Sequence, residues 1–102
     1  MTRVVVSSPA QTDAAHIFSY LAANAGFPVA TRYAAAFERF YDRLALQPKS
    51  GSPRRALGPR IRIGVIAPYI VIYEYDGADD SVIVLRVVHG RRKIAGKLLS
   101  SE

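Results

Sequence analysis

The chain of 102 residues has no cysteine, two histidines, and no apolar run near the roughly 20 residues of a membrane span. It therefore has no disulfides or cysteine metal sites, and two distant histidines do not make a zinc site. It also lacks a glycine-rich phosphate loop and a serine in a nucleophile elbow. We expect no metal, no cofactor and no membrane segment. We also expect a cytoplasmic location, because the first residues lack the apolar region of a signal peptide.

Acidic residues are few, and the excess of basic residues is concentrated in the second half of the chain. Residues 1–48 hold four Lys/Arg and three Asp/Glu, a balance of +1. Residues 49–102 hold ten and five, a balance of +5, and the two halves give the net charge of +6. A basic surface of this kind suits nucleic acid, a ribosome or an acidic protein partner.

One stretch of strand length predicts the centre of a sheet. Ser81–His89 is rich in β-branched and aliphatic residues at both parities, and a strand that is apolar on both faces is usually internal. Simple alternation predicts two faces, one with Ile83, Leu85 and Val87 and the other with Val82, Val84 and Val88. Gly90 ends the run, and a short basic helix is expected over Arg91–Leu99.

Two amphipathic helices precede this strand. Ser8 is expected to cap the first helix, with Pro9 at its first position and Gln11 where a capping box places Glu or Gln. Gly26 ends this helix and Pro28 opens the second. Because the turn between them is so short, the two helices must lie antiparallel.

The remaining segments predict an α+β fold in one domain over residues 1–102. We expect an antiparallel sheet whose N-terminal strand lies at an edge, packed by the N-terminal helical hairpin, with a short C-terminal helix. The expected strands are the edge strand Arg3–Ser7 and a three-stranded meander of Ile61–Ala67, Tyr69–Tyr75 and Ser81–His89.

The candidate site residues are basic. Pro48–Arg60 has prolines and glycines that predict an irregular loop, and it holds four cations and no acidic residue. One metal-free chemistry is arguable, RNA cleavage with His89 as general acid or base and with nearby arginines stabilising phosphate charge. The residues expected to contact a partner are Arg54, Arg55, Arg60, Arg62, Arg91, Arg92 and Lys93.

The order of elements, together with four short motifs, resembles the RelE/ParE toxin superfamily over nearly the whole chain. The motifs are Val-Val-Val-Ser-Ser-Pro-Ala at 4–10, Leu-Gly-Pro-Arg-Ile-Arg at 57–62, Pro-Tyr-Ile-Val-Ile-Tyr at 68–73 and Leu-Arg-Val-Val-His-Gly-Arg-Arg at 85–92. The resemblance implies the toxin of a type II toxin–antitoxin pair, of the plasmid stabilisation type, which a small antitoxin holds inactive.

The superfamily has two activities. RelE-like members are ribosome-dependent messenger RNA endonucleases. They typically carry basic residues on the first meander strand, an arginine just after the tyrosine that opens the second, and near the C-terminus an arginine and often an aromatic residue or a histidine. Arg62 and Arg91 fit the basic pattern, and His89 fits the histidine variant. Here Ile70 follows Tyr69, and no aromatic residue follows Tyr75. The chain is more similar to the ParE-like branch, whose members inhibit DNA gyrase.

This resemblance implies gyrase as the target and a ParD-like antitoxin as the partner. A basic toxin with an apolar groove suits an acidic, amphipathic segment that folds on binding. Two alternatives stay open. One is a RelE-like endoribonuclease that uses His89, Arg91 and Arg62 on ribosome-bound RNA. The other is an inactive basic binding module that retains only antitoxin binding.

Overall fold

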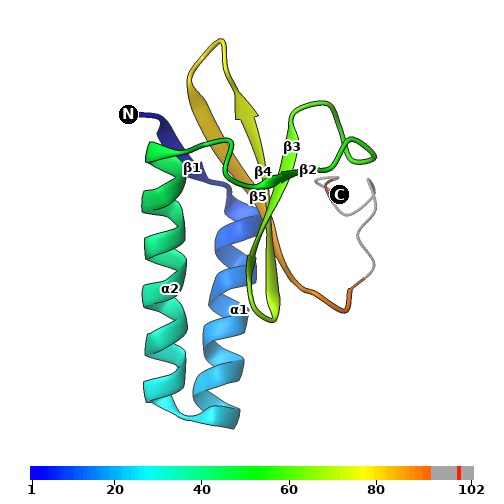
Figure 1. Ribbon diagram of the computed structural model, residues 1–102. Helices are drawn as coiled ribbons and strands as arrows, with labels where there is room; N and C mark the ends of the chain where they lie inside the picture. Colours follow the sequence, from blue (N-terminus) through cyan, green and yellow to red (C-terminus); the bar gives the residue numbers. More distant parts are fainter. Residues whose placement is uncertain (93–98, 100–102) are drawn as a thin grey trace.

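The computed structural model describes residues 1–92 and residue 99 of the chain. The elements are β1 (Arg3–Val6), α1 (Ser8–Ala25), α2 (Phe27–Leu46), β2 (Ser52–Pro53), β3 (Ile61–Ile66), β4 (Tyr69–Asp76) and β5 (Ser81–His89). This arrangement confirms the expected α+β fold, and Figure 1 shows α1 and α2 side by side next to the twisted sheet. Of the expected C-terminal helix, Arg91 and Arg92 form a turn, and residues 93–98 lie outside the described residues.

The sheet is mixed rather than purely antiparallel. Its strand order is β1-β5-β4-β3-β2, and β1 runs parallel to β5 whereas the other neighbours are antiparallel. Parallel strands need a long crossover between them, and the helical hairpin begins that crossover here. β1 lies at an edge and β5 lies between two strands, as the sequence predicted. The loop expected to be irregular adds the short strand β2 at the other edge.

A β-bulge interrupts the pairing of β4 with β5. Ile72 lies opposite Arg86, whereas the next residue, Tyr73, lies opposite Val84, so β5 has one residue more than β4 at this point. The extra residue is Leu85. An inserted residue of this kind reverses the alternation of side chains beyond it.

The bulge makes the predicted faces of β5 wrong at its C-terminal end. Alternation placed Val87 with Leu85 and placed Val88 with Val84. In the structure, Val87 packs with Val84 in the core beneath the helices. Val88 packs instead with Leu85 on the opposite side of the sheet. The sequence signal for an apolar strand was correct, but its period is broken at Leu85.

Each face of the sheet carries an apolar cluster. The larger cluster lies between the sheet and the hairpin, where Phe37, Phe40 and Leu44 of α2 join Val71 and Tyr73 of β4. The smaller cluster lies on the other side, which we call the far face. It consists of Ile61, Ile72 and Val88, with Leu57, Ile63, Ile70, Leu85 and Leu99 packed against them.

Helix α1 is capped one residue earlier than the sequence predicted. The hydroxyl of Ser7, not Ser8, accepts a hydrogen bond from the backbone N–H of Ala10 at 3.3 Å. Gln11 does not close a capping box, because its side-chain amide donates to the carbonyl of Val6 at 2.8 Å. This shift brings the start of α1 directly against β5.

β5 continues beyond the end of β1, and there side chains at the start of α1 form hydrogen bonds with it. The Ser7 hydroxyl donates to the carbonyl of Leu85 at 3.1 Å. The Asp13 carboxylate accepts from Nε and Nη2 of Arg86 at 2.7 and 2.9 Å, and from the backbone N–H of Val87 at 2.9 Å. The hydrogen bonds that Arg86 donates to Asp13, together with the negative charge of Asp13, raise the pKa of Arg86. The backbone groups at this edge of β5 therefore find hydrogen-bond partners on the helix rather than on another strand.

The hairpin turns at a single linking residue, Gly26. Its φ of 97° lies in the region that favours glycine, because a Cβ is strained there. Pro28 stands in the first turn of α2, where its missing N–H has no helical partner to lose. The short turn holds the two helices antiparallel, and Leu21 and Ala30 are buried between them and the sheet.

Candidate functional site

The basic loop, residues 48–60, is tied to the sheet by one phenol. The hydroxyl of Tyr73 donates to the carbonyl of Pro48 and accepts from the N–H of Gly51, both at 2.8 Å. Burial raises the pKa of Tyr73, although the bond from Gly51 and the charge of Arg62 act in the opposite direction. The phenol therefore stays protonated and keeps both bonds near neutral pH.

Arg62, a predicted site residue, supports the same loop. Its Nη1 donates to the carbonyl of Lys49 at 3.0 Å and to the carbonyl of Gly51 at 2.7 Å. Two of its donors are thus directed at the backbone of its own chain. Arg62 opposes Tyr73 in the β3–β4 ladder, so it lies on the helix side of the sheet.

The other predicted cations of the loop lie on the surface. Arg54 and Arg55 are exposed, and the backbone carbonyls of both accept turn hydrogen bonds from residues 57 and 58. Arg60 forms a 3.5 Å ion pair with Glu74, at side-chain exposures of 58% and 32%. Such an exposed pair contributes little to stability, so Arg60 is available to a partner at small cost.

The C-terminal group of predicted residues lies at the opposite end of the sheet. His89 opposes Tyr69, and the two rings meet edge to face at 5.9 Å between centroids. The Nδ1 atom of His89 accepts from the backbone N–H of Arg91 at 3.1 Å, and Arg91 is exposed, as is Arg92. Lys93 lies outside the described residues.

The structure does not bring His89 and Arg62 together. Their partners on β4, Tyr69 and Tyr73, are four residues apart, which is about 13 Å along a strand. The predicted basic residues therefore form two groups, one around the basic loop and one after β5. A single phosphate does not reach both.

Ile70 belongs to the apolar cluster of the far face. It opposes Val88 in the β4–β5 ladder and packs with Ile72, which is fully buried. This is the position that follows the opening tyrosine of β4. An aliphatic side chain built into such a cluster offers no donor to a phosphate.

An apolar groove runs along the helical hairpin, and we call it the hairpin groove. Its larger hollow, about 640 Å³, lies between α1 and α2 near β1. A second hollow of about 390 Å³ continues it toward the turn, and the two share Phe18, Thr31 and Ala34. Phe27 lines the second hollow with 75% of its surface exposed. The apolar faces of the two helices therefore extend beyond the surface that packs against the sheet.

Two polar residues border the hairpin groove. Burial, and beside it the charge of Glu38, raises the pKa of Tyr41 from 10.0 to about 12. Tyr41 and Glu38 both line the larger hollow. The groove thus accepts an apolar surface with a few polar contacts at its rim, the pattern of a helix-binding site.

Among residues 1–92 and 99, no group of three or more His, Cys, Asp or Glu side chains is placed to hold a metal ion. Neither α1 nor α2 is long and apolar enough to cross a membrane. The described surfaces offer charge recognition by exposed arginines and apolar docking on the hairpin.

Comparison with known families decides the relationship. Residues 4–94 match the family model described as ParE toxin of type II toxin-antitoxin system, parDE. The chain belongs to the ParE toxin family. Among curated proteins, it is 32% identical over 98 residues to Toxin ParE3 of Caulobacter vibrioides, with 96% of both chains covered.

Solved structures share the ParE fold. A chain of the chromosomal ParDE toxin–antitoxin system from P. aeruginosa has a TM-score of 0.71 at 16% identity, covering 87% of this chain and 96% of that one. A chain of the RelBE2 toxin–antitoxin complex from Mycobacterium tuberculosis has a TM-score of 0.64 at 23% identity, with coverages of 86% and 96%. The resemblance to the RelE/ParE superfamily is confirmed.

Proposed function

We propose that this ParE-family toxin binds DNA gyrase and stalls it on cut DNA. The position of Ile70 carries this proposal. RelE-like ribonucleases typically have an arginine there, whereas here the far face is closed by Ile70, Ile72 and Val88. A missing charged group at a phosphate site lowers catalysis by about 3 kcal/mol or more, a factor of over a hundred.

The basic surface supplies the contacts with the target under this proposal. Gyrase bound to cut DNA presents phosphates and acidic protein surface, both of which attract arginines. Of the predicted residues, Arg62 has its guanidinium directed at the loop backbone, so it acts mainly by positioning that loop. The direct contacts are assigned to Arg54, Arg55, Arg60, Arg91, Arg92 and Lys93.

We also propose that an acidic antitoxin of the ParD type neutralises this toxin by docking an amphipathic helix in the hairpin groove. The support is the apolar lining of the groove, the exposed Phe27 at its end, and the net charge of +6. An acidic partner gains from apolar burial and from charge complementarity, and the second contribution weakens with salt.

The decisive experiment measures two activities of the purified full-length chain. One assay detects gyrase-mediated DNA cleavage complexes, and the other detects cleavage of ribosome-bound message. We expect cleavage complexes and no message cleavage. The double variant Arg91→Glu with Arg92→Glu should reduce the cleavage complexes at least tenfold, because two contacts become repulsive.

The matched control is Arg32→Glu with Arg39→Glu, which makes the same change of charge on exposed positions of α2. We expect this control to keep its activity on gyrase. Message cleavage that is lost on His89→Ala would instead establish the ribonuclease alternative. Absence of both activities, together with normal growth on induction, would leave the chain as a binding module.

A further inference from the structure

One edge of the sheet is left open over part of its length. At this edge, β2 pairs only with Arg62 and Ile63 of β3, and the ladder stops there. The chain on the N-terminal side of β2 turns away at Gly51 toward the end of α2. Within the described residues, β3 therefore continues from Gly64 to Ile66 with β4 on one side and no strand on the other.

The backbone groups at this edge point outward at Val65. The carbonyl of Ile61 accepts from the N–H of Arg54 on the β2 side, whereas the carbonyl of Arg60 accepts from the N–H of Tyr75 on the β4 side. Because strand residues alternate, Ile61, Ile63 and Val65 direct their N–H and C=O groups toward this edge. Residues 52–54 pair with Ile61 and Ile63, so the open groups are those of Val65, a residue that is 63% exposed.

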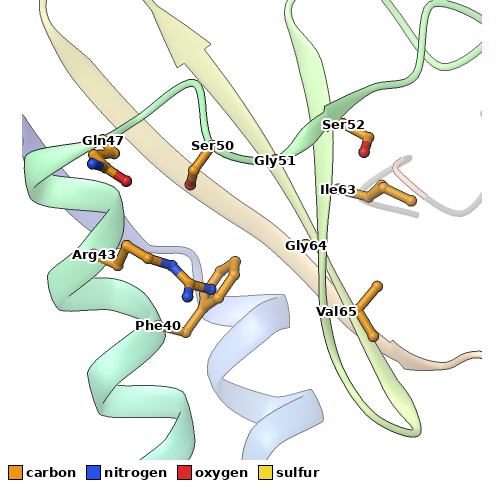
Figure 2. A pocket seen from close by; sticks show the side chains of 9 residues that line it. All are labelled: Phe40, Arg43, Gln47, Ser50, Gly51, Ser52, Ile63, Gly64 and Val65. Atoms are coloured by element: carbon orange, nitrogen blue, oxygen red, sulfur yellow. The ribbon is translucent and has the colours of Figure 1, made fainter.

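A hollow of about 410 Å³ lies directly beside this edge, between α2 and β3. Figure 2 shows Arg43 and Phe40 reaching in from α2, with the side chains of Ile63 and Val65 turned away from the helix. The wall opposite α2 is therefore strand backbone. Gly64 has no side chain there, and the Phe40 ring occupies the place that a Cβ would take.

A second hollow extends the same groove. It measures about 330 Å³ and is lined by Arg32, Tyr33 and Ala36 of α2, by Ile66 at the end of β3 and by Ala67 after it. Together the two hollows follow α2 on one side and the open edge of β3 on the other. We call them the α2/β3 groove. It lies across α2 from the hairpin groove, and the two share no lining residue.

The charge of the α2/β3 groove has one sign. Arg43 and Arg32 line its two hollows, and Arg39, which lines neither, lies along the same face of α2 because it is seven residues after Arg32 and four before Arg43. The guanidinium of Arg43 lies 5.4 Å from the centre of the Phe40 ring. No ion pair of residues 1–92 involves these three arginines, and residues 43–73 include no carboxylate.

We propose that the α2/β3 groove binds an extended, acidic segment of a partner protein. The segment adds a strand beside Val65, with backbone hydrogen bonds at the open edge. Its alternate side chains then face α2 and set their carboxylates against Arg32, Arg39 and Arg43. Strand addition gives such a segment its affinity through the backbone, and the arginines give the specificity for acidic side chains.

The test uses a fluorescent twelve-residue peptide of alternating glutamate and valine with the full-length chain, measured by fluorescence anisotropy. We expect the peptide to bind, and the binding to weaken at high salt. Arg43→Glu should weaken it about tenfold or more, because a charge-assisted contact becomes repulsive. The matched control is Arg3→Glu, an exposed arginine on β1 at the opposite edge of the sheet, which should bind the peptide as the parent does.

The backbone contribution has its own variant. Val65→Pro removes one outward N–H at an edge position, where proline is tolerated, and should weaken binding at least several-fold. Val65→Thr keeps the N–H and is the matched control. If Val65→Pro does not fold, the amide signals of Val65 and Ile66 in the parent chain replace it, since both should shift on adding the peptide.

Three results overturn the proposal. The first is no binding at about 1 mM peptide, and the second is equal binding of a lysine–valine peptide. The third is binding that is not weakened by Arg43→Glu and does not shift the amide signal of Val65. These outcomes are independent of the assays on gyrase and message. A chain that stalls gyrase but ignores the peptide loses this inference and keeps its proposed function.

Discussion

The ion pair between Asp13 and Arg86 predicts a large loss of stability when the carboxylate is removed. Asp13→Ala deletes the acceptor of three hydrogen bonds, two from the Arg86 guanidinium and one from the N–H of Val87. The Asp13 side chain is 15% exposed and that of Arg86 is 21% exposed. The donors are therefore only partly rehydrated after the substitution.

The expected magnitude follows from these contacts. Removing one partner of a buried ion pair costs about 3–5 kcal/mol, and the partial exposure of this pair places it at the lower end. We expect Asp13→Ala to lower the free energy of unfolding by about 3 kcal/mol. For a domain of this size, that corresponds to a fall of roughly 15 °C in Tm. Asp13→Asn keeps an acceptor for Val87 and should cost less.

Urea unfolding of the isolated chain, followed by circular dichroism, measures this change. Asp42→Ala is the control, because Asp42 is exposed on α2 and forms none of the ion pairs of the described residues. It should change stability by less than about 0.5 kcal/mol. A double-mutant cycle with Arg86→Met should give a coupling energy above about 1 kcal/mol. Additive losses, or a loss below about 1 kcal/mol for Asp13→Ala, would refute the reasoning.

Three further predictions concern stability and local order. Tyr73→Phe should lower the free energy of unfolding by about 1–2 kcal/mol and speed amide exchange in residues 48–53, because two loop hydrogen bonds are lost. Gly64→Ala should destabilise the fold because the added Cβ meets the Phe40 ring. The double variant with Phe40→Leu, measured by urea unfolding, should recover part of the lost stability. Stability measured by urea should fall between pH 10.0 and about 12, because the unfolded chain loses the proton of Tyr41 first, and Tyr41→Phe should flatten this fall.

The element types were predictable from the sequence because each has a local signal. The helices have apolar stripes and a glycine between them, and the meander has an aspartate–glycine turn. The cap was misplaced by one residue because Ser7 and Ser8 are chemically equivalent candidates. Only the contact of Ser7 with Leu85, 78 residues away in the chain, distinguishes them. A local pattern does not contain that contact.

The prediction of which residues share a face of β5 was wrong for a related reason. A bulge depends on the pairing of two strands, and the sequence of β5 alone contains no interruption at Leu85. The direction of β1 was missed similarly, since a short run of valines pairs equally well in either direction. Its parallel register, with Val4 opposite Val82, is set by the position of the helical hairpin.

The candidate site was predicted in composition but not in geometry. Charge counting found the cations, yet it could not show that Arg62 serves the loop backbone or that the loop and the residues after β5 lie at opposite ends of the sheet. It also passed over the arginines of α2, because acidic neighbours at Glu38 and Asp42 balance them in any local sum. The position of their helical face beside the open edge of β3 is visible only in three dimensions.

The parallel pairing of β1 with β5 has a consequence for synthesis. Among the described residues, β1 has β5 as its only strand neighbour, so residues 3–6 cannot pair until residues 81–84 have been made. Strand β5 also holds the centre of the sheet, with pairs to β1 and β4. We expect a nascent chain that stops before Ser81 to remain unfolded. An interrupted translation of this toxin then releases a product without its binding surfaces, and only finished chains reach the target.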